Sequence, residues 1–296
     1  MNHNQQQKAR VAKPRWLKRS LPTGPTYENV RAMLSKSRLH TVCQEAQCPN
    51  LWECFSRQTS TFLIMGPRCT RNCCFCAVAH GPSGRPDPGE PSRVAEATHS
   101  LGLSYVVITS VTRDDLPDGG AGLFAKTIKE IHARMPDTLV EVLIPDFQGN
   151  EDALQTVLEA NPHVLNHNLE TVLRLYPSVR PEADYRRSLT LLKRAKQYNP
   201  SIPTKSGLML GLGESPEEVE KTLHDLLGVG CSILTLGQYL QPTREHLKVE
   251  RFIPPEEFDG WKESALRMGF SEVASGPLVR SSYRAKELYQ ALRLRK

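Results

Sequence analysis

The stretch TFLIMGPRCTRNCCFC, residues 61–76, joins a short apolar run to a cluster of cysteines. Thr61–Met65 is apolar and of strand length, which is typical of a buried β-strand. The loop after it carries Cys69, Cys73 and Cys76 in the spacing C-x3-C-x2-C. In parallel α/β folds, the loops at the carboxyl ends of the strands build the functional site. These residues therefore predict an α/β protein with a cysteine site after its first strand.

Apolar runs rich in β-branched residues alternate with amphipathic stretches along the rest of the chain. Such alternation implies right-handed crossovers and a parallel sheet. About six strand–helix units fit before the pattern changes near Pro242, whereas a closed barrel needs eight. We therefore predict a partial, splayed (β/α)6 TIM-like barrel, with an open doubly wound sheet as the alternative. The predicted strands are Thr61–Met65, Tyr105–Ser110, Leu139–Ile144, His163–Asn168, Ser206–Leu210 and Ile233–Leu240. The predicted helices are Arg93–Leu101, Gly122–Arg134, Glu151–Ala160, Tyr185–Tyr198, Pro216–Leu227 and, before an irregular terminus, Glu256–Met268.

The length of 296 residues suits one barrel-sized unit with extensions at both ends. We expect an N-terminal extension with cysteines over residues 1–60, a barrel core over 61–241 and a C-terminal extension over 242–296. No stretch approaches the roughly 18 consecutive apolar residues of a membrane span, and the polar start Met1–Gln7 is no secretory signal. We therefore expect a cytoplasmic protein with no membrane partner.

The net charge of +6 gathers at the two ends of the chain. These basic residues are either ordinary solvated termini or an electropositive face that attracts an acidic partner. They are Lys8, Arg10, Lys13, Arg15, Lys18 and Arg19 at the start, and Arg280, Arg284, Lys286, Arg293, Arg295 and Lys296 at the end.

Seven of the eight cysteines fall within residues 43–76. A disulfide framework is typical of small secreted domains, so ligation of a metal or cluster is the better interpretation of this long chain without an export signal. Three thiolates can hold three irons of a cubane and leave the fourth iron open to a cofactor, whereas structural zinc needs four protein ligands. Half of a zinc site, completed by a distant His or Cys, is the alternative for Cys69, Cys73 and Cys76.

A second set of cysteines, Cys43, Cys48 and Cys54, has the spacing C-x4-C-x5-C and precedes the first strand. Alone, it fits zinc as readily as a cluster. Together, CQEAQCPNLWECF at Cys43, CTRNCCFC at Cys69 and RSSY at Arg280 resemble the lipoyl synthase family of radical S-adenosylmethionine enzymes. The resemblance covers nearly the whole chain. It includes KPRWLKRSLP at Lys13, TSVTRDDLPDGGA at Thr109, NHNLET at Asn166, KSGLMLGLGE at Lys205 and GQYLQPT at Gly237.

This resemblance implies two [4Fe–4S] clusters. The set Cys69, Cys73 and Cys76 would hold the cluster that binds S-adenosylmethionine, with Phe75 at the usual aromatic position of the motif. The set Cys43, Cys48 and Cys54 would hold an auxiliary cluster, which a serine of RSSY completes. That serine is Ser281 or Ser282, and we favour Ser282. A serinate oxygen is a poorer match for cluster iron than a thiolate, which suits a cluster that is taken apart.

Polar residues near the strand ends are candidates for binding S-adenosylmethionine, and each could instead be a satisfied strand-end residue. The candidates are Thr109 and Ser110 for the amino group, Asn168 and Glu170 for the ribose, and Lys205 and Ser206 for the carboxylate.

The charged loop Arg113–Asp118 either is held by salt bridges or orients substrate or cofactor. His163 and His167 are four residues apart in a predicted strand, where they lack the geometry of a helical metal pair, so we favour packing for both.

The family resemblance also implies the reaction, which is that of a sulfurtransferase. A 5′-deoxyadenosyl radical takes hydrogen from C6 and then C8 of an octanoyl chain on a carrier-protein lysine, and the auxiliary cluster donates the two sulfurs. The implied partners are octanoylated lipoyl carrier domains (E2 subunits of 2-oxoacid dehydrogenases and the glycine cleavage H protein), a low-potential electron donor such as ferredoxin or flavodoxin, and an iron–sulfur carrier protein.

Two other functions would also explain part of this pattern. A methylthio-transferring RNA modifier would explain both sets of cysteines, but the chain shows no appended basic RNA-binding domain, so we expect no nucleic-acid partner. A zinc protein that binds nucleic acid would explain the cysteines and the charge without catalysis.

Overall fold

A computed structural model describes residues 13–18, 25–56 and 60–294. Its main sheet contains β1 (His40–Thr41), β2 (Thr61–Ile64), β5 (Tyr105–Ser110), β6 (Leu139–Leu143), β7 (Val164–Asn166), β8 (Thr204–Leu210), β9 (Ile233–Gln238) and β10 (Glu272–Gly276). The strands lie in that order, with β1 antiparallel to β2 and all other neighbours parallel. The sheet is an open part of a barrel, because β1 and β10 form its two ends. A small sheet pairs β3 (Arg68–Cys69) with β4 (Ala79–His80).

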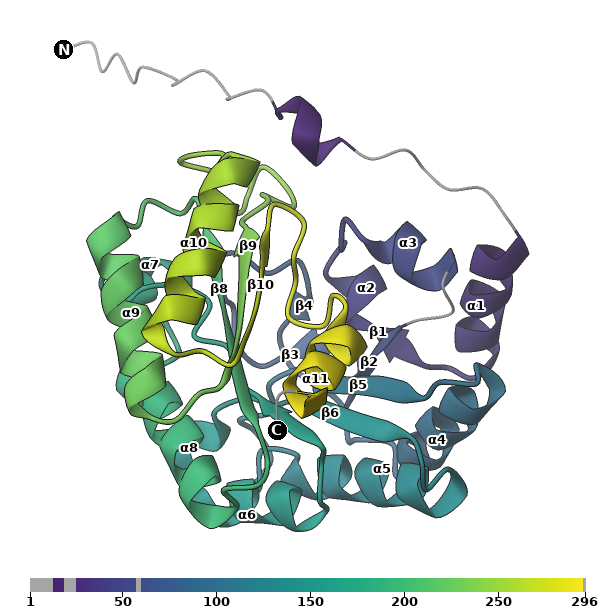
Figure 1. Ribbon diagram of the computed structural model, residues 1–296. Coiled ribbons are helices and arrows are strands. Elements are labelled where there is room, and N and C mark those ends of the chain that lie inside the picture. Colours follow the sequence, from purple (N-terminus) through teal and green to yellow (C-terminus); the bar gives the residue numbers. More distant parts are fainter. Residues whose placement is uncertain (1–12, 19–24, 57–59, 295–296) are drawn as a thin grey trace, which may run out of the picture.

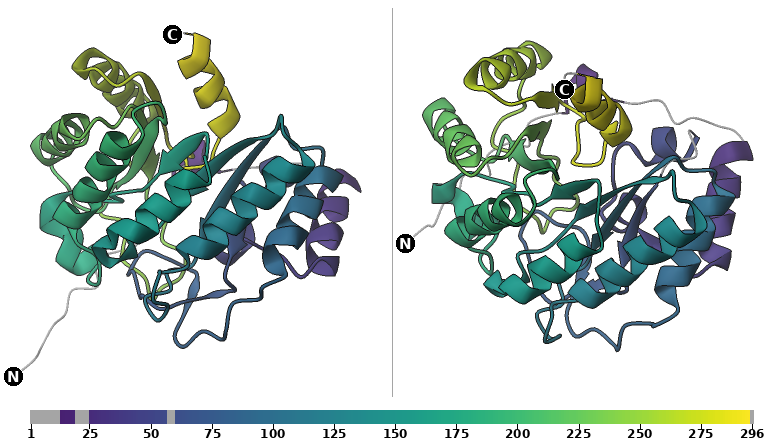
Figure 2. Two further views of the ribbon diagram at one scale, coloured as in Figure 1. Left: turned by 90° about the horizontal axis from the view of Figure 1, so that it is seen from below. Right: turned by 60° about the horizontal axis from the view of Figure 1, so that its bottom comes forward.

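The long helices cover the outer face of this curved sheet (Figures 1 and 2). They are α4 (Glu90–Ser100), α5 (Ala121–Arg134), α6 (Glu151–Glu159), α8 (Tyr185–Tyr198), α9 (Pro216–Gly228) and α10 (Pro255–Met268). The helix α9 shows how the sequence sets such a boundary, since Ser215 and Glu218 form a capping box before Pro216 at the first position. Among the described residues, no helix is both long enough and apolar enough to cross a membrane.

The shorter helices lie in the extensions and loops. They are η1 (Arg15–Leu17), α1 (Pro25–Lys36), α2 (Val42–Glu45), α3 (Leu51–Ser56), η2 (Phe147–Gly149), η3 (Leu173–Leu175), α7 (Tyr176–Val179) and α11 (Ala285–Leu294). Helices α1 to α3 lie at the β1 end of the sheet, opposite α10 at the β10 end (Figure 1).

The fold is the predicted partial barrel, and the six predicted strands and six predicted helices are all present. The prediction of an irregular terminus is wrong, because β10 pairs with β9 over five residues and the sheet therefore runs past residue 241. The sequence of this strand, EVASG, contains only one large apolar residue, so neither alternation nor a β-branched run marks it.

Helix α11 closes the amino end of the half barrel. Its residues Ala285, Tyr289 and Leu292 are buried against the first residues of the strands, among them Tyr105 of β5 and Val164 of β7. The rings of Tyr289 and Tyr105 lie 6.1 Å apart. The inside of the half barrel is therefore filled at this end, which leaves space only toward the carboxyl ends of the strands.

Candidate active site

A cavity of about 550 Å³ lies at the carboxyl ends of the strands. Its volume is within the usual range for cofactor and ligand pockets, about 300–1,000 Å³. The wall combines cysteines from both sets, polar strand-end residues and apolar side chains. The cysteines on it are Cys43, Cys48, Cys69, Cys73 and Cys76.

The loop 68–77, which we call the cluster loop, is fixed by backbone hydrogen bonds to several elements. The amide of Thr70 donates to Thr112 O after β5 (3.0 Å), and that of Cys74 donates to Val179 O at the end of α7 (3.0 Å). From the other side, the amide of Leu247 donates to Cys74 O (3.2 Å). The loop is therefore held between parts of the chain that are far apart in sequence.

The three thiols of the cluster loop lie close enough to influence one another. Burial, and after it the nearby Cys73 and Cys69, raises the pKa of the Cys76 thiol to about 12. Burial also raises the pKa of Cys73, although the neighbouring Arg180 opposes the shift. A metal ligand must be a thiolate, so iron has to displace these protons when it binds.

The upstream cysteines sit in the turns around α2 and α3. The amide of Cys48 donates to Cys43 O (3.0 Å), and that of Cys54 donates to Asn50 O (2.9 Å). Burial, followed by the influence of Cys48 and Cys54, raises the pKa of the Cys43 thiol to about 12. Cys54 is thus close to Cys43, although it is not on the cavity wall.

The C-terminal tail brings the RSSY residues to the upstream cysteines. Asn50 donates from Nδ2 to Leu278 O (2.7 Å) across 228 positions of sequence, and the hydroxyl of Tyr283 donates to Glu53 Oε1 (3.2 Å). The tail also passes close to β9 at Gly237, where a Cβ would lie 2.2 Å from Val279 O. Glycine is required for this approach.

Both serines of the motif line the cavity. Their surroundings differ, since the hydroxyl of Ser281 accepts a hydrogen bond from Asn168 Nδ2. For Ser282 the structure gives a backbone contact, in which its carbonyl oxygen accepts from the amide of Ala285 (3.4 Å). The Ser281 hydroxyl is thus engaged with the barrel wall.

Four of the residues predicted to contact the cofactor, and Phe75, are brought together on the cavity wall. Asn168 donates from Nδ2 to Glu170 Oε1 (3.0 Å), and burial raises the pKa of Glu170. The residues are Thr109, Ser110, Asn168 and Glu170.

The expectation for Lys205 and Ser206 is not met. Lys205 Nζ is 2.9 Å from Glu141 Oε1, and both side chains are 1% exposed. Tyr105 donates to the other oxygen of Glu141 at 2.6 Å, which completes a buried polar layer below the cavity. The hydroxyl of Ser206 accepts from the amide of Leu169 (3.2 Å). A buried ammonium needs such a partner, so Lys205 is held away from the cofactor site.

Two residues on the wall were not identified from the sequence as site residues. Arg180 donates from one nitrogen to Asn168 O (3.0 Å) and Leu169 O (3.1 Å). His167, for which the sequence favours packing, is fully buried, and burial lowers its pKa to about 4. A neutral imidazole bonded through Nδ1 to Ile144 O (2.8 Å) leaves Nε2 as an acceptor.

The polar atoms of this wall fit S-adenosylmethionine. Four of them are buried and have no hydrogen-bond partner among the described residues, a costly arrangement unless a ligand provides one. The atoms are Ser110 Oγ, His167 Nε2, Asn168 Oδ1 and Arg180 Nε.

The cysteines fit a cluster better than a single ion. Within the described ranges, no three His, Cys, Asp or Glu side chains converge as one metal ion would require. A cubane needs no such convergence, because each thiolate binds a different iron. Iron–sulfur ligation therefore suits both sets of cysteines.

Comparison with known proteins decides the family. The model of the radical SAM superfamily matches residues 63–226, and that of the N-terminal domain of lipoyl synthase matches residues 1–48. Lipoyl synthase of Desulfotalea psychrophila is 58% identical over 99% of this chain and 98% of its own length. Lipoyl synthase of Thermus thermophilus is 56% identical over 94% of this chain and 86% of its own length. The chain belongs to the lipoyl synthase family. As a member, it is a radical S-adenosylmethionine enzyme and a sulfurtransferase that uses an iron–sulfur cluster.

Solved structures support the fold. The hydrogenase maturase HydG has a TM-score of 0.56 and 15% identity, with coverage of 90% of this chain and 70% of the maturase. SuiB of Streptococcus suis bound to S-adenosylmethionine has a TM-score of 0.57 and 11% identity, with coverage of 83% of this chain and 54% of SuiB. At such identities the likeness concerns the radical SAM fold alone.

Proposed function

We propose that this member of the lipoyl synthase family holds two [4Fe–4S] clusters and inserts sulfur at C6 and C8 of a protein-bound octanoyl-lysine. The observation that carries the proposal is that cysteines of both sets open on one cavity. A chain held between the two sites can reach both without leaving the protein, which replaces an encounter between separate molecules with positioning.

We assign the roles of the two cysteine sets from the family resemblance, and their common cavity supports the assignment. Cys69, Cys73 and Cys76 would hold the cluster that binds S-adenosylmethionine. Cys43, Cys48 and Cys54 would hold the auxiliary cluster with Ser282 as the fourth ligand. We favour Ser282 over Ser281 because the Ser281 hydroxyl already pairs with Asn168. When bound, the first cluster and its cofactor supply a 5′-deoxyadenosyl radical, and the auxiliary cluster supplies sulfur.

The polar wall would orient the cofactor. The two ribose hydroxyls can donate to Glu170, whose position Asn168 fixes by a hydrogen bond. The buried guanidinium of Arg180 is suited to the carboxylate, in place of Lys205. Ser110 and Thr109 remain candidates for the amino group, and Phe75 for contact with the cofactor near the cluster.

The apolar part of the wall would hold the octanoyl chain and exclude water. An alkyl C–H bond is far too weakly acidic for any side-chain base, so the protein's own work is to place the carbon and to prevent side reactions of the radical. The apolar residues include Leu63, Val111, Leu143, Met209 and Leu240.

The carrier would approach over the basic N- and C-terminal residues. Lys13 and Arg280 both line the cavity. Burial, and after it the charge of Arg280, lowers the pKa of Lys13. We propose that octanoylated lipoyl carrier domains bind here. A low-potential electron donor and an iron–sulfur carrier protein would be further partners, and the site of action would be the cytoplasm.

Anaerobic turnover with an octanoyl-lysyl peptide tests the function. We expect mass spectrometry to show two added sulfurs, and analysis of the purified protein to give about eight irons with matching sulfide, as two cubanes require. Four irons would contradict the auxiliary cluster, and zinc without sulfide would contradict both clusters.

A further inference from the structure

A row of alternating charges lies behind the cluster loop. Arg71, between Cys69 and Cys73, donates to both carboxylate oxygens of Asp114, from Nε (2.6 Å) and Nη2 (2.9 Å). Its Nη2 also donates to Asp146 Oδ1 at 2.6 Å. The other oxygen of Asp146 accepts from Arg187 Nε of α8 at 2.8 Å. We call Asp114, Arg71, Asp146 and Arg187 the charged bridge.

The centre of the bridge is inaccessible to water. The side chain of Asp146 is 0% exposed and that of Arg71 is 5% exposed. Burial alone would raise the pKa of Asp146, but the hydrogen bond and charge of Arg71 outweigh burial and lower it. A buried carboxylate with two guanidinium partners has its charge compensated, and removal of one partner leaves the other uncompensated.

The backbone after Asp146 adopts a left-handed turn. Phe147 has φ of 46°, Gln148 of 51° and Gly149 of 83°. For residues other than glycine, this conformation is strained and persists only where the surroundings enforce it. Here Phe147 is buried and meets Phe124 edge to face at 6.5 Å. The turn aims Asp146 inward, where the amide of Gln148 also donates to its Oδ1 (3.1 Å).

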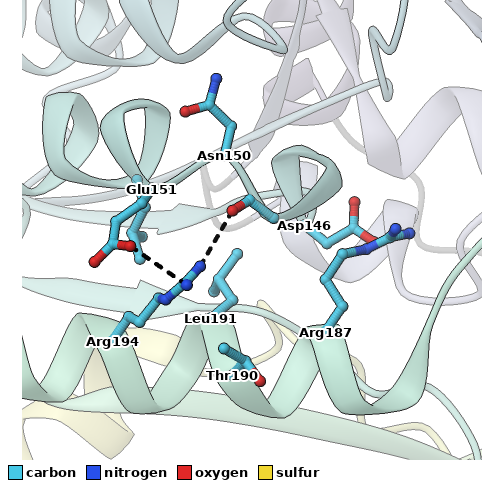
Figure 3. A pocket seen from close by; sticks show the side chains of 9 residues that line it. Asp146, Asn150, Glu151, Arg187, Thr190, Leu191 and Arg194 are labelled. Atoms are coloured by element: carbon cyan, nitrogen blue, oxygen red, sulfur yellow. Dashed lines mark hydrogen bonds and ion pairs between the residues drawn. The ribbon is translucent and has the colours of Figure 1, made fainter.

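The outer end of the bridge reaches a surface hollow of about 90 Å³ (Figure 3). Arg187 points toward Asp146 there, while Arg194 points toward Glu151, with 3.3 Å between the charged atoms. Glu151 shares the hollow with Asp146, and its ion-pair partner Arg194 also donates to Gly149 O in the turn (3.2 Å). A control that changes Glu151 therefore leaves Arg194 and this bond to the turn in place.

We propose that Asp146 is a positioning residue, which acts through Arg71 to hold the backbone between Cys69 and Cys73 in its cluster-binding shape before iron binds. The inference rests on the proposed role of the Cys69, Cys73 and Cys76 thiolates. Because Arg71 lies two positions from each of two ligands, the direction of its side chain constrains the backbone between them.

The test compares Asp146→Asn with Glu151→Gln, since each replaces a carboxylate by an amide at the same hollow. Hydrogen–deuterium exchange of the metal-free protein reports the loop without any cluster. We expect peptides covering residues 68–77 to exchange about 10-fold faster in Asp146→Asn, as the loss of a hydrogen bond to a charged group predicts. The same peptides should be unchanged in Glu151→Gln.

Arg71→Lys is the second variant, because it keeps the charge but loses the fork that contacts two carboxylates. If Asp146→Asn does not fold, exchange of residues 68–77 is measured in Arg71→Lys instead. In the double variant, loop exchange should be no faster than in the more affected single variant, since both changes remove the same interaction between Arg71 and Asp146. Additive effects would overturn the proposal. So would unchanged loop exchange, or faster exchange spread evenly over the barrel.

The reconstituted protein gives a separate readout. The electron paramagnetic resonance spectrum of the reduced first cluster should be broadened in Asp146→Asn and unchanged in Glu151→Gln. An unchanged spectrum in Asp146→Asn would count against positioning. If the parent protein binds no cluster at Cys69, Cys73 and Cys76, the proposed function fails, while the exchange experiment still decides whether Asp146 positions the loop.

Discussion

The two cysteine sites are built in different ways. The cluster loop donates backbone hydrogen bonds to Thr112 and Val179 and accepts one from Leu247, and these residues belong to separate parts of the chain. The upstream site consists of short turns whose contacts are mostly local, and the tail closes it through Asn50 and Tyr283. Elements with fewer and more local contacts open more easily. The difference supports the proposal that one cluster stays intact and the other is dismantled to give sulfur.

The largest expected effect comes from replacing one cysteine of each set, because each replacement should abolish a different step. Mutation of outer-shell partners of a metal ligand costs 10–100-fold, so loss of a ligand should cost more than about 100-fold. We expect Cys73→Ala to lose cleavage of S-adenosylmethionine by that factor and to keep the auxiliary cluster. Cys48→Ala should still form 5′-deoxyadenosine but transfer no sulfur. Measurement of 5′-deoxyadenosine, inserted sulfur and iron checks both, and sulfur insertion by both variants would contradict the two-cluster assignment.

A second experiment probes the lability of the upstream site. Ser282→Cys should strengthen the bond to iron, because thiolate is the softer ligand, so the cluster should persist and sulfur transfer should slow by about 10-fold or more. Ser282→Ala should give a fragile cluster, and Ser281→Ala should have the smaller effect. Iron-selective spectroscopy and single-turnover sulfur insertion are the measurements. Loss of the cluster only in Ser281→Ala would make the neighbouring serine the ligand, and no effect of any change would end the serine hypothesis.

A third experiment tests whether Arg180 binds S-adenosylmethionine. Hydrogen bonds to charged groups are worth about 1.5–3 kcal/mol, so Arg180→Gln should weaken the binding of S-adenosylmethionine by about 10- to 100-fold. The control is Arg174→Gln, since Arg174 pairs with Glu218 (2.7 Å) at the surface. Equilibrium binding to the reconstituted protein is the measurement. Equal affinities of the two variants would remove Arg180 from the cofactor site.

The smallest effect concerns the basic ends of the chain. Attraction between exposed charges is screened beyond about 10 Å at 0.1 M salt. Turnover on an acidic carrier domain should therefore fall more steeply with added salt than turnover on a short neutral peptide. Initial rates at several salt concentrations test this. Equal salt dependence of the two substrates would remove the idea of electrostatic capture.

Much of the fold could be predicted because its signals are local. The bounds of β5 and α8 agree with the prediction to the residue, since β5 is a continuous run of apolar and β-branched residues and α8 has strong helical periodicity. Helix α11 was missed although Ala285, Tyr289 and Leu292 have helical spacing, which was a usable signal.

The site was predictable where spacing defines it, as for the cysteines, and less so where tertiary contacts do. Lys205 was expected at the cofactor because it stands at the start of a predicted strand, from which it could reach the carboxylate. It pairs in the sheet with Asn166, two positions before Asn168, so it lies deeper in the barrel beside Glu141. Sequence alternation gives the face of a strand but not the depth along it. The hydrogen-bond partners of Arg71 and Arg180 come close only when the chain folds, so no sequence pattern indicated them.

The approach of Val279 to Gly237 has a consequence for synthesis of the protein. Residues near 280 are synthesised after strands β2 to β9 and after both sets of cysteines. We expect a nascent chain to pair these strands first and to complete the second site only once residues 278–283 have emerged. A chain that stops short of residue 278 would then generate radicals without a finished sulfur donor, so premature termination would yield a hazardous product rather than an inert one.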